Sequence, residues 1–331
     1  MIIDRYVFAA GSEVFCCWDH DLATRNMRFL TSVDGQYFSY VAECHAAQLD
    51  GSDRQRAAIA LRAAYHHGLE SMFSLLGAFV QAPGAVPAWL PKCSNPALRE
   101  LVEGFQIGST VMTQAGPQQV LLSEIAEHVH GFCWPDDQPT NATKNRFGRL
   151  WSRFAYDFLN PLYYGEYNSI KHGLRVGVGG FVLRVGLEEE YGVPAPEENM
   201  QTLGGSAYGT SFFQATEITG GLPKHHFQIR SQALNWRPEA MVQRLQLIAF
   251  SINNIVSALR CINGVNPATV QFHRPEDPEA FEAAWRWHVG VESSSFDLTL
   301  EAANVDPASR AALQSELNSR TAHASTPQNA P

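Results

Sequence analysis

The sequence predicts an α+β protein that is predominantly a helical bundle with an inserted small antiparallel β-sheet. Three observations predict this class. Long segments repeat their apolar residues with the period of a helix, and the period changes to two between residues 176 and 236. The composition, 45% hydrophobic and 17% charged in 331 residues, is typical of a globular chain. We therefore expect one composite domain over residues 1–319, with helices over about 20–173 and 238–262 and the β insertion over about 176–236.

The clearest helical element covers residues 53–81, which contain no proline. Ser52 and Asp53 suit a helix start because their side chains can accept hydrogen bonds from the first free amides. Ala82-Pro83-Gly84 ends the helix. Residues 21–49 also have a helical pattern, with a break at Asp34-Gly35. Shorter helices are predicted over residues 96–108, 117–131 and 143–159.

Another short helix is predicted over residues 161–172. Asn160 can cap its first turn, and Pro161 suits the first helical position because the N–H that it lacks would have no partner there. Gly173 ends this helix, since glycine adopts the left-handed conformation most easily.

Beyond Gly173 the sequence predicts three strands of one antiparallel sheet with one wet face. They are expected over residues 181–185, 207–219 and 225–234, where apolar residues alternate or β-branched and aromatic residues concentrate. The sequence Gly220-Gly221-Leu222-Pro223-Lys224 predicts a hairpin loop between the last two.

Helix returns over residues 238–262, opened by Pro238 and closed by Asn263-Gly264, with apolar residues at the i, i+4, i+7 spacing of a core face. Shorter helices are predicted over 278–288 and 306–319. The polar tail, residues 320–331, is expected to be disordered because it cannot bury a core.

The net charge and the cysteine pattern limit the classes of function that the chain can have. The net charge of −9 argues against a non-specific nucleic-acid binder covered in lysine and arginine. No apolar stretch approaches the roughly 18 residues of a membrane span, and the N-terminus lacks the basic-then-apolar order of a secretory signal. Six scattered cysteines without a Cys-x-x-Cys pair predict reduced thiols. We expect a cytoplasmic protein without membrane contact, metal or cofactor.

One polar track runs along the long helix. Arg62, His66 and Glu70 lie at i, i+4 and i+8, beside the apolar arc of that helix. Their polar atoms need partners, because an unpaired buried polar atom costs about 1–3 kcal/mol. In one interpretation, His66 and Glu70 form a hydrogen bond with each other at the edge of the core. In the other, they are two ligands of a metal site, which needs three or four ligands in all. His67 points to a face of small residues that another helix can approach closely.

A second polar group lies at the end of the 161–172 helix. Asn168 and His172 are four residues apart on one face, and Lys171 is adjacent. An imidazole near neutral pKa beside the cations Lys171 and Arg175 suits proton transfer next to a phosphate. The alternative is a charged helix end that satisfies its own carbonyls. If the helices form one bundle, we expect the track on the long helix to meet this face.

The segment Tyr167-Asn168-Ser169-Ile170-Lys171-His172 resembles the ribonuclease motif of HEPN domains. HEPN domains are helical bundles, and many are metal-independent ribonucleases or nucleotide-binding modules. A common form of their motif is Arg-Asn-x-x-x-His. Asn168 and His172 match it, while Tyr167 stands where the family has Arg. Four residues also separate Arg62 from His67 on the long helix, but Ala63 follows that arginine.

Two functions follow as hypotheses. The favoured one is a non-catalytic module that binds a nucleotide, RNA or a protein partner, with Arg62, Tyr167 and Arg175 among its binding residues. The alternative, implied by the resemblance, is a metal-independent endoribonuclease in bacterial defence or toxin biology, acting as a homodimer. Its residues would be His172 as acid and base, Lys171 and Arg175 beside the phosphate, Asn168 for orientation, and Glu70 with either His66 or His67 in support. Convergence of His172 with the long-helix residues favours the enzyme; a solvent-facing His172 favours binding.

Overall fold

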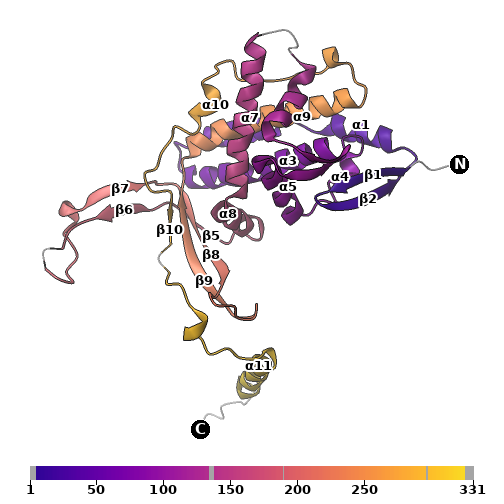
Figure 1. The fold of residues 1–331 in the computed structure, drawn as a ribbon. Helices are drawn as coiled ribbons and strands as arrows, with labels where there is room; N and C mark the ends of the chain where they lie inside the picture. Colours follow the sequence, from indigo (N-terminus) through magenta and orange to yellow (C-terminus); the bar gives the residue numbers. More distant parts are fainter. Residues whose placement is uncertain (1–4, 134–137, 189, 296, 325–331) are drawn as a thin grey trace.

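The computed structural model describes residues 5–133, 138–188, 190–295 and 297–324. The protein is a mixed α+β structure, about 50% helical and 18% strand, and its strands form small antiparallel sheets (Figure 1). The predicted α+β class is therefore confirmed.

The centre of the protein is the contact between its two longest apolar helices, α3 (Arg54–Gln81) and α9 (Pro238–Ile262). Both were predicted, α3 within one residue and α9 with the same bounds. Their facing side chains are almost completely buried, among them Leu69, Phe73 and Leu76 of α3 and Ile248, Ile252 and Ile255 of α9. Removal of this apolar surface from water is the main favourable term in folding.

Helix α9 corrects one expectation about hydropathy. Among the described residues, it is the single helix that is long and apolar enough to cross a membrane by length and composition. However, 72% of its apolar window is buried inside the protein, as in a core helix. This helix is therefore explained by packing, and it gives no evidence for membrane association.

The other helices in the first half of the chain mostly follow their sequence signals. The predicted break at Asp34-Gly35 separates α1 from α2. The Asn160 side chain accepts the amide of Leu162 at 2.9 Å to open α8, and Gly173 after its end has a φ of +111°. These helices are α1 (Leu22–Ser32), α2 (Tyr37–Ala46), α4 (Val86–Trp89), α5 (Asn95–Ile107), α6 (Leu122–Val129), α7 (Gln138–Leu159) and α8 (Pro161–Lys171).

Two β-hairpins were not predicted. The first joins β1 (Arg5–Ala10) to β2 (Glu13–Trp18), and the second joins β3 (Thr110–Thr113) to β4 (Gly116–Gln119). Gly11 and Gly116 take positive φ values of 64° and 104° at their turns, as glycine readily does. Strand β4 occupies the first residues of the helix that was predicted over 117–131, so α6 begins only at Leu122.

The main sheet has four strands in the order β10-β9-β8-β5. The predicted hairpin is present as β8 (Gly209–Glu217) and β9 (Phe227–Asn235), with β5 (Val176–Val178) and β10 (Ser293–Ser294) at the edges. The inner face of this sheet packs against α8, where Phe212 and Leu234 share a small core with Tyr163 and Trp236.

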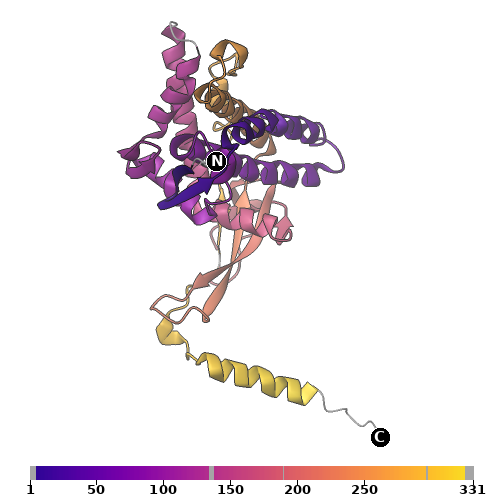
Figure 2. The ribbon, with the colours of Figure 1, turned by 90° about the vertical axis from the view of Figure 1, so that its right-hand side faces the viewer.

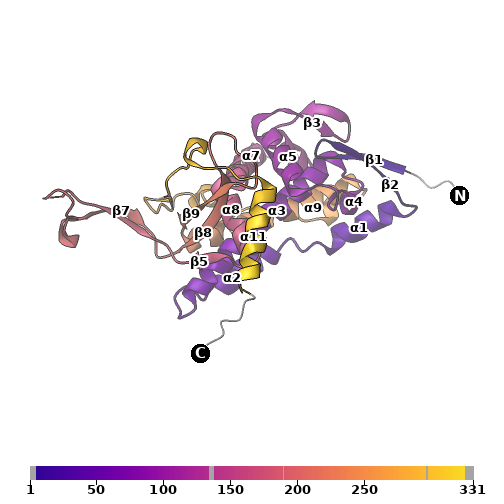
Figure 3. The same cartoon turned by 90° about the horizontal axis from the view of Figure 1, so that it is seen from below.

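The strand predicted over 181–185 does not belong to that sheet. Instead β6 (Val182–Val185) pairs with β7 (Gln201–Gly205) in a separate two-stranded arm, which projects from the rest of the protein (Figures 1 and 3). Gly179, at a φ of +133°, turns the chain out of β5. The amide side chain of Asn235 then holds the backbone N–H and C=O of Phe181, each at 2.9 Å, at the base of the arm.

The C-terminal region differs most from prediction. Within the predicted helix 278–288, α-helix is confined to α10 (Ala280–Ala283). The amides of Trp285 and Arg286 donate to carbonyls three residues earlier, as in a 3₁₀ turn, so the α-helical pattern ends there. Helix α11 (Arg310–Ala324) extends into the predicted disordered tail and stands apart from the body (Figure 2). The rest of that tail lies outside the described residues. Short 3₁₀ turns occur at His130–Phe132, Glu197–Asn199, Pro267–Thr269 and Ala302–Asn304.

We predict that Gly77→Ala destabilises the protein although alanine is the better helix former. A Cβ atom at position 77 would lie 2.7 Å from the Trp89 ring, and that buried indole is held by hydrogen bonds to Ala9 O and Gln81 Oε1. The expected loss is about 1–3 kcal/mol in the free energy of unfolding, measured by urea denaturation. Gly51→Ala, where the new Cβ has room, is the control. A gain in stability at position 77 would contradict the close contact.

Candidate functional site

A fully buried carboxylate, Glu166 of α8, joins the helices to the sheet. Its Oε2 accepts a hydrogen bond from Arg62 Nε at 2.8 Å and lies 2.7 Å from Arg62 Nη2 and 3.0 Å from His66 Nε2. Its Oε1 accepts from the Trp236 indole at 3.1 Å and from the Thr210 hydroxyl. We call these five residues the Glu166 cluster.

The Glu166 cluster holds its charges in fixed states. Burial alone would raise the pKa of Glu166, but the charge of Arg62 and the hydrogen bond from His66 outweigh burial and lower that pKa to about 2. Burial lowers the pKa of His66 most, and the nearby positive charge of Arg62 lowers it further, so the ring is neutral at pH 7. Since the carboxylate only accepts, His66 Nε2 carries the proton. His66 is therefore a fixed donor rather than a free base.

A second buried charge pair lies beside the first. The Tyr65 hydroxyl donates to Asp157 Oδ2, and Arg244 Nη1 lies 3.0 Å from the same oxygen. Burial raises the pKa of Tyr65 well above its usual value, and the Asp157 charge raises it further. Asp157 and Glu166 thus balance Arg244 and Arg62 where α3, α7, α8 and α9 meet.

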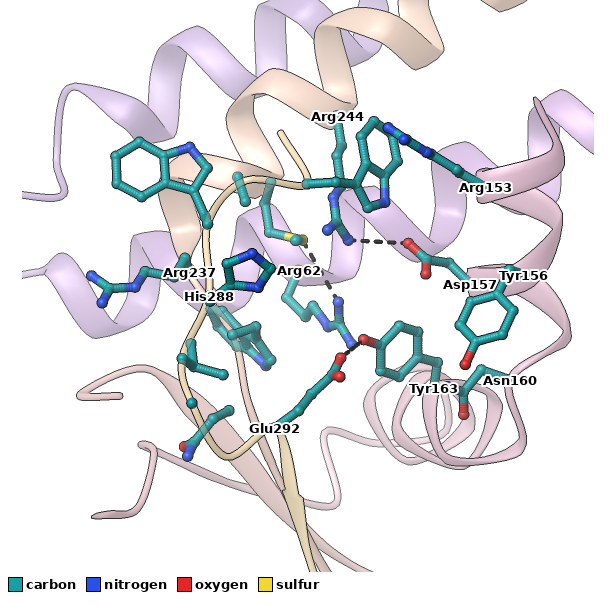
Figure 4. Close-up of a pocket in the computed structure, with 18 residues that line it drawn as sticks. Arg62, Arg153, Tyr156, Asp157, Asn160, Tyr163, Arg237, Arg244, His288 and Glu292 are labelled. Carbon is teal, nitrogen blue, oxygen red and sulfur yellow. Dashed lines mark hydrogen bonds and ion pairs between the residues drawn. The ribbon is translucent and has the colours of Figure 1, made fainter. Parts of the chain in front are cut away.

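A cavity of about 590 Å³ opens directly beside these pairs (Figure 4). Its walls come from α3, α7, α8, the start of α9 and residues 285–292. We call it the arginine cavity because four of its lining residues are Arg62, Arg153, Arg237 and Arg244. Three tryptophans also line it, Trp236, Trp285 and Trp287.

The arginines of this cavity differ in how their charge is balanced. Arg244 and Arg153 both lie over the Trp285 ring, at 4.7 and 5.3 Å from its centre. The ion pair of Arg153 within the described residues is a distant one, 3.9 Å from Glu282. Arg237 is exposed, and no side-chain hydrogen bond or ion pair joins it to a described residue. The positive charge at the rim is therefore the least compensated.

Four residues expected from the sequence line a second hollow of about 420 Å³: His67, Glu70, Tyr167 and Lys171. Lys171 Nζ lies 3.2 Å from Glu70, whose other oxygen accepts from the Tyr167 hydroxyl at 2.5 Å. The Tyr167 ring also stacks on the His66 ring, with 5.3 Å between the two ring centres. The predicted meeting of the long-helix track with α8 thus occurs, through Glu166, Tyr167 and Lys171.

The remaining motif residues do not join this contact. His172 and Arg175 are exposed, and Asn168 is half-buried. Within the described residues, no side-chain hydrogen bond or ion pair connects any of the three to the long helix; His172 bonds back to Asn168 only through its backbone. His172 therefore faces solvent apart from His66 and Glu70, and its role in RNA cleavage stays a prediction.

Sequence reasoning missed several residues of the site, notably Glu166, Asp157, Thr210, Trp236 and Arg244. One signal was available for Glu166: Tyr163 and Ser169 lie three residues to either side, so helical spacing places all three on one face. The structure buries that face. The others come from distant elements, and their spacing carries no comparable pattern. Among the described residues, no three His, Cys, Asp or Glu side chains are grouped as metal ligands.

No protein-family model, no curated protein and no solved structure matches the chain.

We predict that Glu166→Gln lowers the free energy of unfolding by about 3 kcal/mol, because it leaves the Arg62 charge buried without its counter-ion. Glu70→Gln is the matched control on the neighbouring contact. Its pair with Lys171 is partly exposed, so it should cost less than about 1 kcal/mol. Urea denaturation of both variants measures the difference, and equal losses would contradict the central role of Glu166.

Acidification should destabilise the protein through its buried histidines. Burial lowers the pKa of His130 from 6.5 to about 4, and the pKa of His66 is also lowered. Below pH 6.5 the histidine at position 130 binds a proton in the unfolded chain but stays neutral in the folded protein. The contribution of His130 to the free energy of unfolding is therefore fully present above pH 6.5 and is lost as the pH falls to about 4. His130 should contribute about 3 kcal/mol of the loss. Denaturation of wild type and His130→Gln between pH 7 and pH 4 should give a flatter profile for the variant; parallel profiles would contradict it.

Proposed function

We propose that the protein is a non-catalytic binding module and that its arginine cavity binds a nucleotide. One observation carries the proposal. In a chain with a net charge of −9 and only 24 lysines and arginines, four arginines and three tryptophans converge on one cavity. Guanidinium groups are the preferred partners of phosphate, and indole faces accept planar bases.

The phosphate end of the ligand is assigned to the rim. Arg62 and Arg244 already share their charge with Glu166 and Asp157. Arg237 and Arg153 therefore hold the positive charge that a ligand can neutralise. Arg237 is the residue before α9 and Arg153 belongs to α7, and both line the cavity. In Figure 4 the Arg237 guanidinium points outward, away from Arg62 and Arg244.

The base end of the ligand is assigned to Trp287, because Arg153 and Arg244 already lie over the Trp285 ring and Trp236 is buried. Trp287 is 46% exposed, and with Trp285 it belongs to the segment that closes one side of the cavity. Stacking of one base on an aromatic ring contributes about 1–3 kcal/mol. Because about half of the Trp287 side chain is exposed, its indole is available for such stacking.

Size favours a mononucleotide over an RNA strand. A cavity of about 590 Å³ lies within the usual range for small-molecule sites, whereas a single strand needs an extended groove that follows its backbone. The solvent-facing position of His172 supports binding over the ribonuclease alternative, because an acid–base residue needs partners that orient it.

The fold relation proposed with this function is a HEPN-like helical bundle made of α3, α7, α8 and α9. Its support is the packing of α3 against the other three helices. The motif residues Asn168, on α8, and His172, directly after it, add to this support.

The test is a calorimetric titration with ATP, with adenosine and pyrophosphate as partial ligands. We expect ATP to bind with a Kd of about 1–100 μM, and adenosine to bind more weakly because it lacks phosphate. Arg237→Ala should weaken ATP binding about tenfold.

The matched control is Arg286→Ala, an exposed arginine that pairs with Glu279 and does not line the cavity. Its affinity for ATP should equal that of wild type. Absence of binding for every nucleotide tested, or an equal loss in both variants, would contradict the proposed function.

A further inference from the structure

The two-stranded arm leaves large apolar side chains in solvent. Leu187 is 90% exposed and Tyr191 is fully exposed, and both belong to the loop that joins β6 to β7. Val182, Val185 and Leu203 on the strands are also about half exposed. Scattered apolar residues are normal on a surface, but a projecting element that carries this many usually contacts a partner.

The arm has little to stabilise it by itself. An isolated two-stranded hairpin is marginally stable in water, and independent stability needs a third strand or a packed face. Its links to the rest of the chain are at its base, where Gly205 N–H donates to Val289 O at 2.7 Å and Asn235 holds Phe181. A partner along the outer part of the arm would supply the missing contacts.

The charge of the arm selects the kind of partner. Its described residues include four glutamates, Glu188, Glu190, Glu197 and Glu198, against the single cation Arg184. Two arms that paired with each other would bring like charges together, which is unfavourable. A basic surface with aromatic side chains is the complementary partner.

This chain carries such a surface on α7. Arg146, Arg149 and Arg153 lie at i, i+3 and i+7, so they form one stripe along the helix. Tyr156 follows on the same helix, 70% exposed, and it lines the same cavity as Trp287. We call Arg146, Arg149, Arg153 and Tyr156 the basic stripe.

We infer that the occupant of the basic stripe is the arm of a second copy of this chain. The arm projects away from the helices of its own chain (Figures 1 and 3), so it cannot cover its own stripe in this arrangement. Reciprocal exchange, with each arm on the other copy's stripe, gives a closed two-fold dimer with two identical contacts. Arg153 and Tyr156 of the stripe also line the arginine cavity, whereas Arg146 and Arg149 do not. The inference therefore goes beyond nucleotide binding, and its test substitutes only Arg146 and Arg149.

Analytical ultracentrifugation tests the inference over a roughly hundredfold range of protein concentration. Wild type should form a dimer. The arm variant Leu187→Ser/Tyr191→Ser and the stripe variant Arg146→Glu/Arg149→Glu should each be monomeric. Leu298→Ser, which removes an apolar residue that is 87% exposed outside the arm, is the control and should remain dimeric. Circular dichroism checks that every variant is folded.

Mixing the two monomeric variants makes the test specific. The stripe variant still has an intact arm, and the arm variant still has an intact stripe, so the mixture should regain association through one of the two contacts. A wild-type monomer at every concentration would overturn the inference. A dimer that survives both pairs of substitutions, or a mixture that stays monomeric when wild type dimerises, would overturn it as well.

Discussion

The buried ion pair between Arg62 and Glu166 is the constraint on which the rest of the structure depends. Two charges removed from water must be matched closely, and desolvation makes such a pair a weak source of net stability. Its value lies in specificity. Because Glu166 also accepts hydrogen bonds from His66, Thr210 and Trp236, only one placement of α8 between α3 and the main sheet satisfies all of its partners.

The same pair explains where the cavity lies. Arg62 is fixed by Glu166 on one side and lies 4.4 Å from the Tyr163 ring centre, so it forms a rigid floor. Arg244 is held in the same way by Asp157. Since these two charges are already matched, the least compensated positive charge of the cavity belongs to Arg153 and Arg237.

Sequence periodicity and capping predicted the long helices well. Helices α3, α8 and α9 have strong local signals: unbroken apolar periods, Asn160-Pro161, Gly173 and Pro238. The short hairpins at residues 5–18 and 110–119 lack enough alternation to be recognised, and tertiary contact with the core decides them. The strand at 181–185 was recognised locally, but its partner depends on the turn at Gly179, which no local pattern fixes.

The site was only partly predictable for a related reason. The long-helix track pointed correctly to the contact between α3 and α8, since helical spacing places Arg62, His66 and Glu70 in line. Which α8 residues meet that track depends on the rotation of α8, and that rotation buries Glu166 and leaves His172 in solvent. Arg153, Arg237, Arg244 and Trp287 converge only through tertiary structure, so a sequence motif could not bring them together.

The Glu166 cluster also sets an order of events during synthesis. Arg62 precedes Glu166 by 104 residues, and Trp236 follows Glu166 by another 70. At a translation rate of about 5–20 residues per second, α3 waits roughly 5–20 s for its counter-ion. Helix α9, the main packing partner of α3, follows α8 in the chain. The counter-ion of Arg62 is therefore synthesised before the helix that completes the burial of α3, so the charge can be matched before that apolar face is closed.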